Sequence, residues 1–234
     1  MSCERVNVVI IGGGVVGCGV AYELSKSLDG ILLIEKNPKI VGENQSSRSS
    51  RVIHSGIYYD KRISPKKAKL CVEGNKLIYE FCLEYGVQHR KTGKLVIATN
   101  KLEEEYVDAT LAIARENGVP GVRKISIEEA RDMGPKVYGV SALCVPTSGI
   151  VDATGLVSTL HSLASQGGAD TLLGSKVVGI EPMSDGFKLV IEQGHARETL
   201  ETKILVNCAG LFSDDIANMV NPENNYEIDP VKGE

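Results

Sequence analysis

Three glycines near the N-terminus have the spacing that lets a protein backbone approach a bound dinucleotide. They lie in the run Ile11-Gly12-Gly13-Gly14-Val15-Val16-Gly17. In this pattern Gly12 permits a tight turn, Gly14 lets the backbone approach a pyrophosphate, and Gly17 lets a helix pack closely on the preceding strand. A helix that begins here offers unpaired N–H groups and its positive dipole end to phosphate. The spacing therefore predicts a dinucleotide site.

An acidic residue follows the glycines at the position expected for recognition of a ribose. Glu35 ends the apolar run Leu32-Leu33-Ile34 and lies about 20 residues after Gly14, the spacing expected of the acid that binds a ribose hydroxyl. A carboxylate disfavours a 2′-phosphate at the same place, because two negative charges would meet. The expected ligand contains ADP. Both NAD and FAD contain ADP, so the motif does not distinguish between these two cofactors.

The elements needed to position these residues occur in the right order. The β-branched run 6–11 predicts a strand before the glycines, residues 15–28 predict a helix, and residues 32–34 predict a second strand. A glycine-rich turn without a ligand is the alternative. Strand, glycines, helix and terminal acid within one βαβ unit argue against it.

Composition narrows the class of protein. The chain has 234 residues, 42% hydrophobic and 24% charged, which is ordinary for a globular protein. Its net charge of −4 gives no reason to expect nucleic acid as a partner. No apolar run approaches the roughly 18 residues of a membrane span, so no transmembrane segment is expected. The first strand leaves no room for a signal peptide, and we expect a cytoplasmic location, or a mitochondrial one if a transit peptide was removed.

The cysteines and histidines suggest no metal site. Six cysteines and four histidines are scattered without a CxxC pair or a cluster at metal-ligand spacing. Most of the cysteines lie in apolar runs, where a free thiol behaves as a small hydrophobic group. We expect reduced cysteines and no metal.

Residues 37–64 form a polar, irregular segment, and such segments inside a compact domain are usually functional or disordered. Apolar and aromatic residues at its far end, Val52-Ile53-His54-Ser55-Gly56-Ile57-Tyr58-Tyr59, argue against disorder. Ser46, Arg48, Ser49 and Arg51 could bind a pyrophosphate or a carboxylate, although arginines on a solvated loop are the alternative. His54 is the best candidate for a general base, because histidine titrates in the useful range.

The remaining chain predicts a discontinuous domain. Helices are expected over 65–85, over 102–117 before Gly118, after the capping box Ser126/Glu129, from Asp152 to about Ser165, and up to about Val220. Strands are expected over 94–99, 141–145, 169–173, 176–183, 187–192 and 204–208. This order predicts an α/β fold: a Rossmann-like domain of residues 1–64 and 150–222, with an inserted α+β domain of residues 65–149 and 223–234.

Several segments resemble one enzyme family in both sequence and order. They are 10–17, 52–59 (VIHSGIYY), 67–74 (KAKLCVEG), 93–96 (GKLV), 117–121 (NGVPG), 149–152 (GIVD) and 206–213 (VNCAGLFS). These residues resemble the FAD-dependent oxidoreductases of the D-amino-acid-oxidase superfamily, and within it most closely the L-2-hydroxyglutarate dehydrogenases. The resemblance favours FAD over NAD. It also implies that the chain is an N-terminal fragment of a longer protein.

The resemblance implies roles for particular residues. His54 would lie beside the flavin and act as base, or only hydrogen-bond to the flavin or backbone. From the residue types alone, Arg51 is a candidate for binding the substrate carboxylate, and Lys94 and Lys232 are weaker candidates for binding its charge. Tyr59 is a further substrate candidate, although Tyr58 and Tyr59 could instead cover the flavin or simply pack. Ala209 and Gly210 would end a strand near the cofactor, and the backbone of Val177 would contact adenine. The expected cofactor-binding set is Gly12, Gly14, Val15, Val16, Gly17, Glu35, Lys36, Ser46, Arg48, Ser49, His54, Val177, Ala209 and Gly210.

The resemblance implies the oxidation of a 2-hydroxy acid, with L-2-hydroxyglutarate, oxidised to 2-oxoglutarate, as the leading candidate. A hydride would pass to flavin N5, and an unidentified electron acceptor would then take the electrons from the flavin. One alternative is a flavin-dependent glycerol-3-phosphate dehydrogenase, which shares the Ser/Arg loop and a similar IHxG segment. The other is a dinucleotide-binding fragment without turnover of its own.

Overall fold

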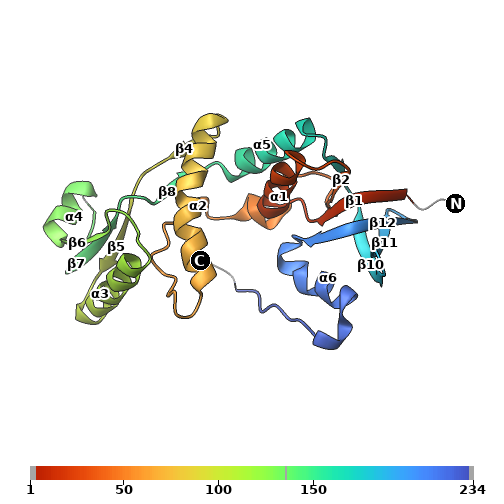
Figure 1. Ribbon diagram of the computed structural model, residues 1–234. Helices are drawn as coiled ribbons and strands as arrows, with labels where there is room; N and C mark the ends of the chain where they lie inside the picture. The colour runs from red at the N-terminus through yellow and green to blue at the C-terminus, as the bar shows by residue number, and fades with distance from the viewer. Residues whose placement is uncertain (1–3, 135, 232–234) are drawn as a thin grey trace. The chain divides into compact units, whose positions relative to one another are not determined.

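The computed structural model describes residues 4–134 and 136–231, which form two compact units. The first unit is Met1–Ser49 with Ala153–Glu234, and the second is Ser50–Asp152. Figure 1 labels their helices and strands.

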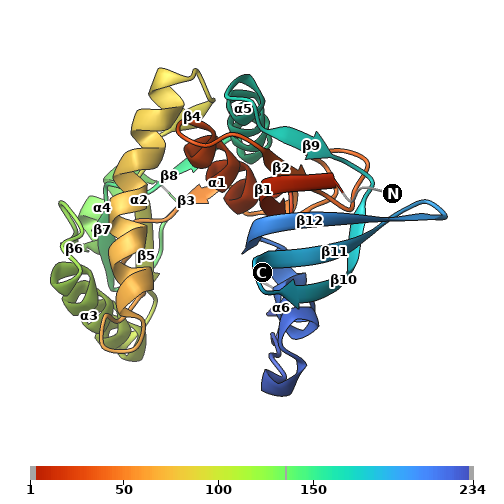
Figure 2. The same ribbon diagram turned by 45° about the vertical axis from the view of Figure 1, so that its right-hand side comes forward.

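The first unit is built on a six-stranded sheet in the order β10-β11-β12-β1-β2-β9 (Figure 2). Its strands are β1 (Glu4–Ile11), β2 (Ile31–Ile34), β9 (Asp170–Leu172), β10 (Lys176–Met183), β11 (Gly186–Gln193) and β12 (Ala196–Asn207). Strands β12, β1, β2 and β9 are parallel, while β10, β11 and β12 form an antiparallel meander. Strands from after residue 150 therefore rejoin the first βαβ unit, and the expected α/β fold is confirmed.

Helices cover the two faces of this sheet. Helices α1 (Val15–Ser25) and α5 (Ala153–Gln166) pack side by side (Figures 1 and 2). Helix α6 (Ser213–Val220) packs on β10 and β12 and contributes Ile216 to a core that contains Val9 and Ile11. Because side chains alternate along a strand, the buried Val8 and Ile10 face the opposite layer.

Two elements of the first unit differ most from their expected bounds. Helix α1 ends at Ser25 rather than residue 28. Strand β12 begins at Ala196, eight residues before the expected start at Ile204. Its first half is polar because only Leu200 and Thr202 point into the core, while the antiparallel hairpin with β11 satisfies its backbone. The 3-10 helices η1 (Gln45–Arg48), η2 (Gly210–Phe212) and η3 (Pro222–Asn224) complete the unit.

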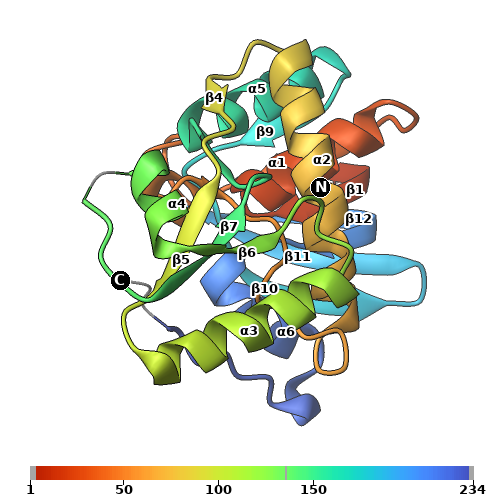
Figure 3. The same cartoon turned by 90° about the vertical axis from the view of Figure 1, so that its left-hand side faces the viewer.

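The second unit contains two small antiparallel sheets. One has the order β5-β7-β6, formed by Lys94–Ala98, Ser141–Val145 and Arg123–Ser126. Helix α3 (Lys101–Glu116) covers the face that carries Leu143 and Val145, and α4 (Ile127–Met133) covers the face that carries Ala142 (Figure 3). The other sheet has the order β3-β8-β4, formed by Val52–Ile53, Gly149–Val151 and His89–Arg90, and α2 spans Pro65–Glu84.

The contacts divide the chain at different positions from the sequence-based boundaries at 64/65, 149/150 and 222/223. Residues 50–64 belong to the second unit, where Val52 and Ile53 of β3 pair with β8. Residues after 222 stay with the first unit, where the Asn218 side chain hydrogen-bonds to the backbone N–H and C=O of Tyr226. Residues 232–234, including Lys232, lie outside the described part of the chain.

The Ser126 capping box provides a test of the local structure. The Ser126 hydroxyl accepts a hydrogen bond of 3.2 Å from the Glu129 N–H at the start of α4. Ser126→Ala leaves that N–H without this partner, and we expect the free energy of unfolding to fall by about 1 kcal/mol. Urea denaturation measures the change. Ser162→Ala, at an exposed position on α5, is the control; an equal loss in both variants would contradict the capping role.

Within the described residues, no helix combines the length and the apolar character needed to cross a bilayer. No group of three or more metal-ligating side chains is found in the same residues. Cys18, Cys71, Cys82, Cys144 and Cys208 are free thiols.

Candidate functional site

The glycine turn brings three backbone segments into close contact. Gly12 has φ of +108°, and a Cβ atom there would overlap the carbonyl oxygen of Cys208. A Cβ atom at Gly17 would overlap the carbonyl oxygen of Gly12. The first and third glycines are therefore required by the packing of β1, α1 and the end of β12, as their positions in the motif predict.

The N-terminus of α1 is capped from another part of the chain. Gly14 is its N-cap residue and has no side chain to satisfy the helix N–H groups. Instead, the Ser46 hydroxyl accepts a hydrogen bond of 2.9 Å from the Val15 N–H. Asn44 stabilises the turn that carries Ser46 by accepting from the Ser47 N–H. The polar segment thus brings a hydroxyl to the positive end of the helix, where a pyrophosphate is favoured.

Glu35 is buried at the end of β2, with 4% of its surface exposed. One carboxylate oxygen accepts from the Gly13 N–H at 2.7 Å, and the other accepts from the Asn37 N–H at 2.9 Å. These bonds fix the carboxylate beside the glycine turn. Each carboxylate oxygen has a further lone pair, so Glu35 can still accept hydrogen bonds from ribose hydroxyls.

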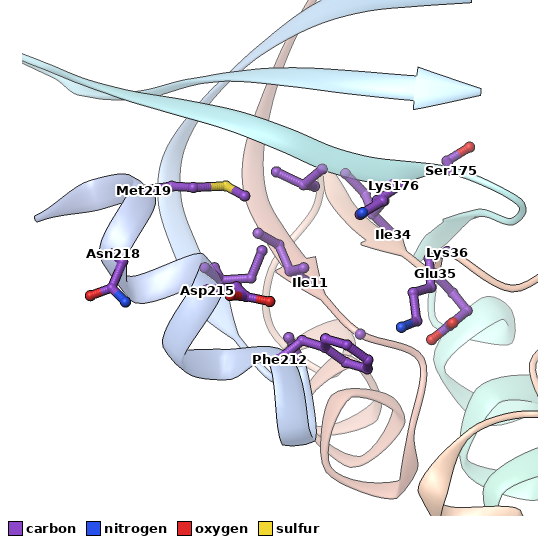
Figure 4. Close-up of a pocket in the computed structure, with 14 residues that line it drawn as sticks. Ile11, Ile34, Glu35, Lys36, Ser175, Lys176, Phe212, Asp215, Asn218 and Met219 are labelled. Atoms are coloured by element: carbon purple, nitrogen blue, oxygen red, sulfur yellow. The ribbon is translucent and has the colours of Figure 1, made fainter. Parts of the chain in front are cut away.

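Two adjoining cavities line this edge of the sheet, with volumes of about 550 and 310 Å³. The larger one lies between β10, the end of β2 and helix α6 (Figure 4). The smaller one lies along the glycine turn and η1. The two cavities share Gly12, Glu35, Lys36, Ala209 and Phe212, and together they offer an elongated groove. A groove that runs from a helix N-terminus past a fixed acid suits a dinucleotide.

Most of the expected cofactor residues of the first unit line this groove. They are Gly12, Gly14, Val15, Val16, Glu35, Lys36, Ser46, Val177, Ala209 and Gly210. Gly17 instead serves helix packing. Arg48 and Ser49 are exposed and line neither cavity.

Sequence reasoning missed the wall that the α6 region contributes. Phe212, Asp215, Asn218 and Met219 line the larger cavity, and Phe212 lies on the side of Glu35 and Lys36 (Figure 4). The Lys36 ammonium lies 3.3 Å from the centre of the Phe212 ring, a cation–π contact. The sequence predicted a short helix here, but its apolar residues gave no sign that one side faces a cavity.

In the second unit, two asparagine side chains hold the segment that contains His54. Asn75 of α2 donates to the carbonyl oxygens of His54 (2.9 Å) and Thr147 (3.0 Å). Asn117, after α3, donates to the carbonyl oxygens of Gly56 (2.8 Å) and Tyr59 (2.7 Å). Both asparagines were absent from the expected site. Their effect is to fix residues 54–59 as a platform.

Two lysines of this unit act electrostatically on His54. Partial desolvation, followed by the charges of Lys94 and Lys67, lowers the pKa of His54 below its usual value. The Lys94 ammonium donates to the Tyr58 hydroxyl at 2.9 Å, and the Lys67 ammonium lies 4.5 Å from the centre of the Tyr59 ring. Burial raises the pKa of Tyr59, which therefore stays a neutral phenol. The imidazole of His54 is therefore neutral at neutral pH, and the ammonium groups of Lys94 and Lys67 act on it.

Arg51 also belongs to the second unit. Its side chain is exposed, and its backbone is left-handed with φ of +61°. Its carbonyl oxygen accepts from the Val151 N–H at 2.9 Å. Of the three expected substrate residues, Tyr59 belongs to the platform and the Lys94 ammonium contacts Tyr58 of the platform. Among the described residues, no hydrogen bond or ion pair joins Arg51 to either of them.

A family model described as "FAD dependent oxidoreductase" matches residues 7–234. The chain belongs to this family. Its cofactor is FAD, as the resemblance implied.

Family relatives carry more specific names. The chain is 34% identical over 230 residues to an L-2-hydroxyglutarate dehydrogenase of Indibacter alkaliphilus, covering 97% of this chain and 56% of the relative. It is 35% identical over 237 residues to the mitochondrial L-2-hydroxyglutarate dehydrogenase of Caenorhabditis elegans, covering 100% and 54%. It is also 35% identical over 230 residues to a glycerol 3-phosphate dehydrogenase of Caloramator mitchellensis, covering 97% and 46%. The chain thus spans about half the length of these relatives.

A solved family structure has the same fold. It is the L-α-glycerophosphate oxidase of Mycoplasma pneumoniae with FAD bound, with a TM-score of 0.83 and 25% identity over 93% of this chain and 57% of the oxidase. The groove fits such a cofactor on three counts: a glycine turn without Cβ atoms, a helix N-terminus facing a cavity, and a fixed acid able to accept ribose hydroxyls.

Glu35→Gln tests the fixed acid. The variant replaces an acceptor of two backbone N–H groups by an amide that can present only one acceptor atom. We expect FAD affinity to fall by about tenfold or more and the free energy of unfolding by about 1–3 kcal/mol. Flavin fluorescence titration and urea denaturation measure these changes. Glu105→Gln, at an exposed position on α3, should change neither; FAD affinity that is unchanged in Glu35→Gln would remove the role of this acid.

Proposed function

We propose that this chain takes part in the FAD-dependent oxidation of a 2-hydroxy acid, with L-2-hydroxyglutarate converted to 2-oxoglutarate. The observation that carries the proposal is the environment of His54: an imidazole with a lowered pKa on a fixed platform, next to two lysines. A base and cations are what a hydroxy acid requires, since its hydroxyl must lose a proton and its carboxylates carry negative charge. The names of two relatives support the same substrate.

Each unit would contribute separate functions. In the first unit, the N–H groups at the start of α1 would face the pyrophosphate, Glu35 the ribose, and the Val177 backbone the adenine. Bound FAD supplies the hydride acceptor of the reaction. In the second unit, the unprotonated ring nitrogen of His54 would take the substrate hydroxyl proton as the hydride leaves C2. Lys94, Tyr59 and Arg51 would contact the substrate.

A second candidate function is oxidation of glycerol 3-phosphate. The relative of that name, at 35% identity, favours it. Lysines bind a phosphate as readily as a carboxylate, so the charge around His54 supports both substrates. A third candidate is a dinucleotide-binding chain without turnover, which the coverage of only about half of each relative favours.

The electron acceptor would be a separate molecule that reoxidises the flavin. The compartment is also a proposal. The C. elegans relative is named a mitochondrial enzyme, which supports the mitochondrial alternative over the cytoplasmic default.

The substrate proposal is tested by comparing flavin reduction under anaerobic conditions. FAD-loaded protein is mixed with L-2-hydroxyglutarate, D-2-hydroxyglutarate or glycerol 3-phosphate, and the loss of flavin absorbance is followed. We expect reduction by the L-enantiomer and much slower reduction by the other two compounds. Faster reduction by glycerol 3-phosphate would replace the proposed function by the second candidate.

A further inference from the structure

We propose that Lys67 is a specificity-determining residue that binds the distal carboxylate of a dicarboxylate whose other carboxylate is bound by Lys94. The inference rests on the proposed function and extends it to a residue outside the expected site. It divides the two negative charges of the substrate between α2 and β5, the elements that carry the two lysines.

The two lysines are held in similar ways above one short segment. Lys94 donates to the Tyr58 hydroxyl, and its ammonium lies 4.7 Å from the centre of the Tyr58 ring. Lys67 lies above the ring of the next residue, Tyr59. The charges of both lysines lower the pKa of His54, and the effect of Lys94 is the larger. We therefore assign the carboxylate next to the reacting carbon to Lys94, and the distal carboxylate to Lys67.

Neither lysine is neutralised by a carboxylate within the described residues. Five other lysines form ion pairs within these residues, including two on the same helix as Lys67: Lys69 with Glu73, and Lys76 with Glu80. By contrast, the contacts of Lys67 and Lys94 are with tyrosines, which supply orientation without cancelling the charge. Two oriented cations without counterions form a receptor for a dianion.

The position of Lys67 in its helix adds to this charge. Helix α2 begins at Pro65, and its first backbone bond runs from the Ala68 N–H to the Ser64 carbonyl. Lys67 thus lies in the first turn of a 20-residue helix, where the helix dipole also favours an anion. The Ser64 side chain makes no cap hydrogen bond to this turn.

Binding of unreactive acids tests the inference directly. Glutarate has two carboxylates and butyrate has one. Neither acid has a hydroxyl group, so neither can be oxidised at C2. FAD-loaded protein with labelled histidine is titrated with each acid, and the dissociation constant is read from the His54 ring signals, assigned with His54→Gln. In Lys67→Met we expect glutarate to bind about tenfold more weakly and butyrate to change by less than about twofold, because only glutarate loses a charge-assisted contact.

Two further variants control for general effects of charge and folding. Lys66→Met removes the same charge from the adjacent exposed position and should leave glutarate binding unchanged. Lys67→Arg keeps the charge and should retain most of the binding, which separates a binding role from a loss of structure. Circular dichroism of each variant checks that the fold persists.

The outcomes separate this inference from the proposed function. Glutarate binding that weakens in Lys94→Met but not in Lys67→Met overturns the role of Lys67 and leaves the proposed function intact. A wild-type chain that binds glycerol 3-phosphate but no glutarate into the millimolar range overturns both. Equal weakening of glutarate and butyrate binding in Lys67→Met would also contradict a receptor for the distal carboxylate.

Discussion

Gly12→Ala is expected to abolish FAD binding. Alanine must adopt φ of +108°, which alone costs about 1–3 kcal/mol, and its Cβ would overlap the carbonyl oxygen of Cys208. The overlap is with backbone, so relief requires β1 and the end of β12 to separate. That movement would also displace the Gly13 N–H from Glu35. We expect at least a hundredfold weaker FAD binding, by fluorescence titration, together with a lower melting temperature.

Gly42→Ala is the matched control for this variant. Gly42 lies in the same unit and also has φ of +108°, but a Cβ atom there would have no neighbour within 4 Å. Both variants therefore carry the same backbone strain, and only Gly12→Ala adds the overlap. FAD binding that weakens equally in the two variants would contradict the proposed importance of the close contact at the glycine turn.

His54→Ala is expected to slow flavin reduction by L-2-hydroxyglutarate by about 10²–10⁴-fold, the usual contribution of a general base. Stopped-flow absorbance under anaerobic conditions measures the rate, and fluorescence titration measures FAD affinity. His195→Ala, in the exposed turn between β11 and β12, is the control. If His54 only hydrogen-bonds to the flavin, the variant will bind FAD more weakly and keep its rate with saturating FAD, which would remove the role of base.

The pH dependence of flavin reduction provides a second test of the role of His54. Only the neutral imidazole can accept a proton, so the reduction rate should rise with pH through the pKa of His54, which lies below the usual value for histidine. Lys94→Met removes a positive charge that disfavours the protonated ring. It should raise the pKa of His54 and move the profile to higher pH. A profile that stays in place in this variant would contradict the assignment to His54.

Local patterns predicted the first unit well because its elements are regular and buried. The apolar β1, the three glycines and Glu35 form a contiguous motif, and the parallel strands alternate with helices as expected. Ser46, in the polar segment that follows β2, was also among the expected cofactor-binding residues, and its hydroxyl accepts from the Val15 N–H. Strand β12 was harder to delimit, because only Leu200 and Thr202 in its first half are buried.

The parts that sequence reasoning missed depend on contacts between distant residues. Asn75 and Asn117 hold residues 54–59 through backbone carbonyls, and an asparagine on a helix or after one carries no signal of that contact. Strand β3 has only two residues, too few for a periodic pattern, yet its pairing with β8 places residues 50–64 in the second unit. Phe212 ends η2 directly before α6, which packs on β10, and this packing between distant segments forms the cavity that Phe212 lines.

The most direct test of the central claim is the visible absorption spectrum of the protein with FAD, recorded before and after anaerobic addition of L-2-hydroxyglutarate. We expect a bound flavin spectrum that bleaches on addition of the acid. A bound flavin that stays oxidised with L-2-hydroxyglutarate but bleaches with glycerol 3-phosphate would contradict the proposed substrate. A protein that remains colourless after FAD addition and gel filtration would contradict the groove as a sufficient site for the cofactor.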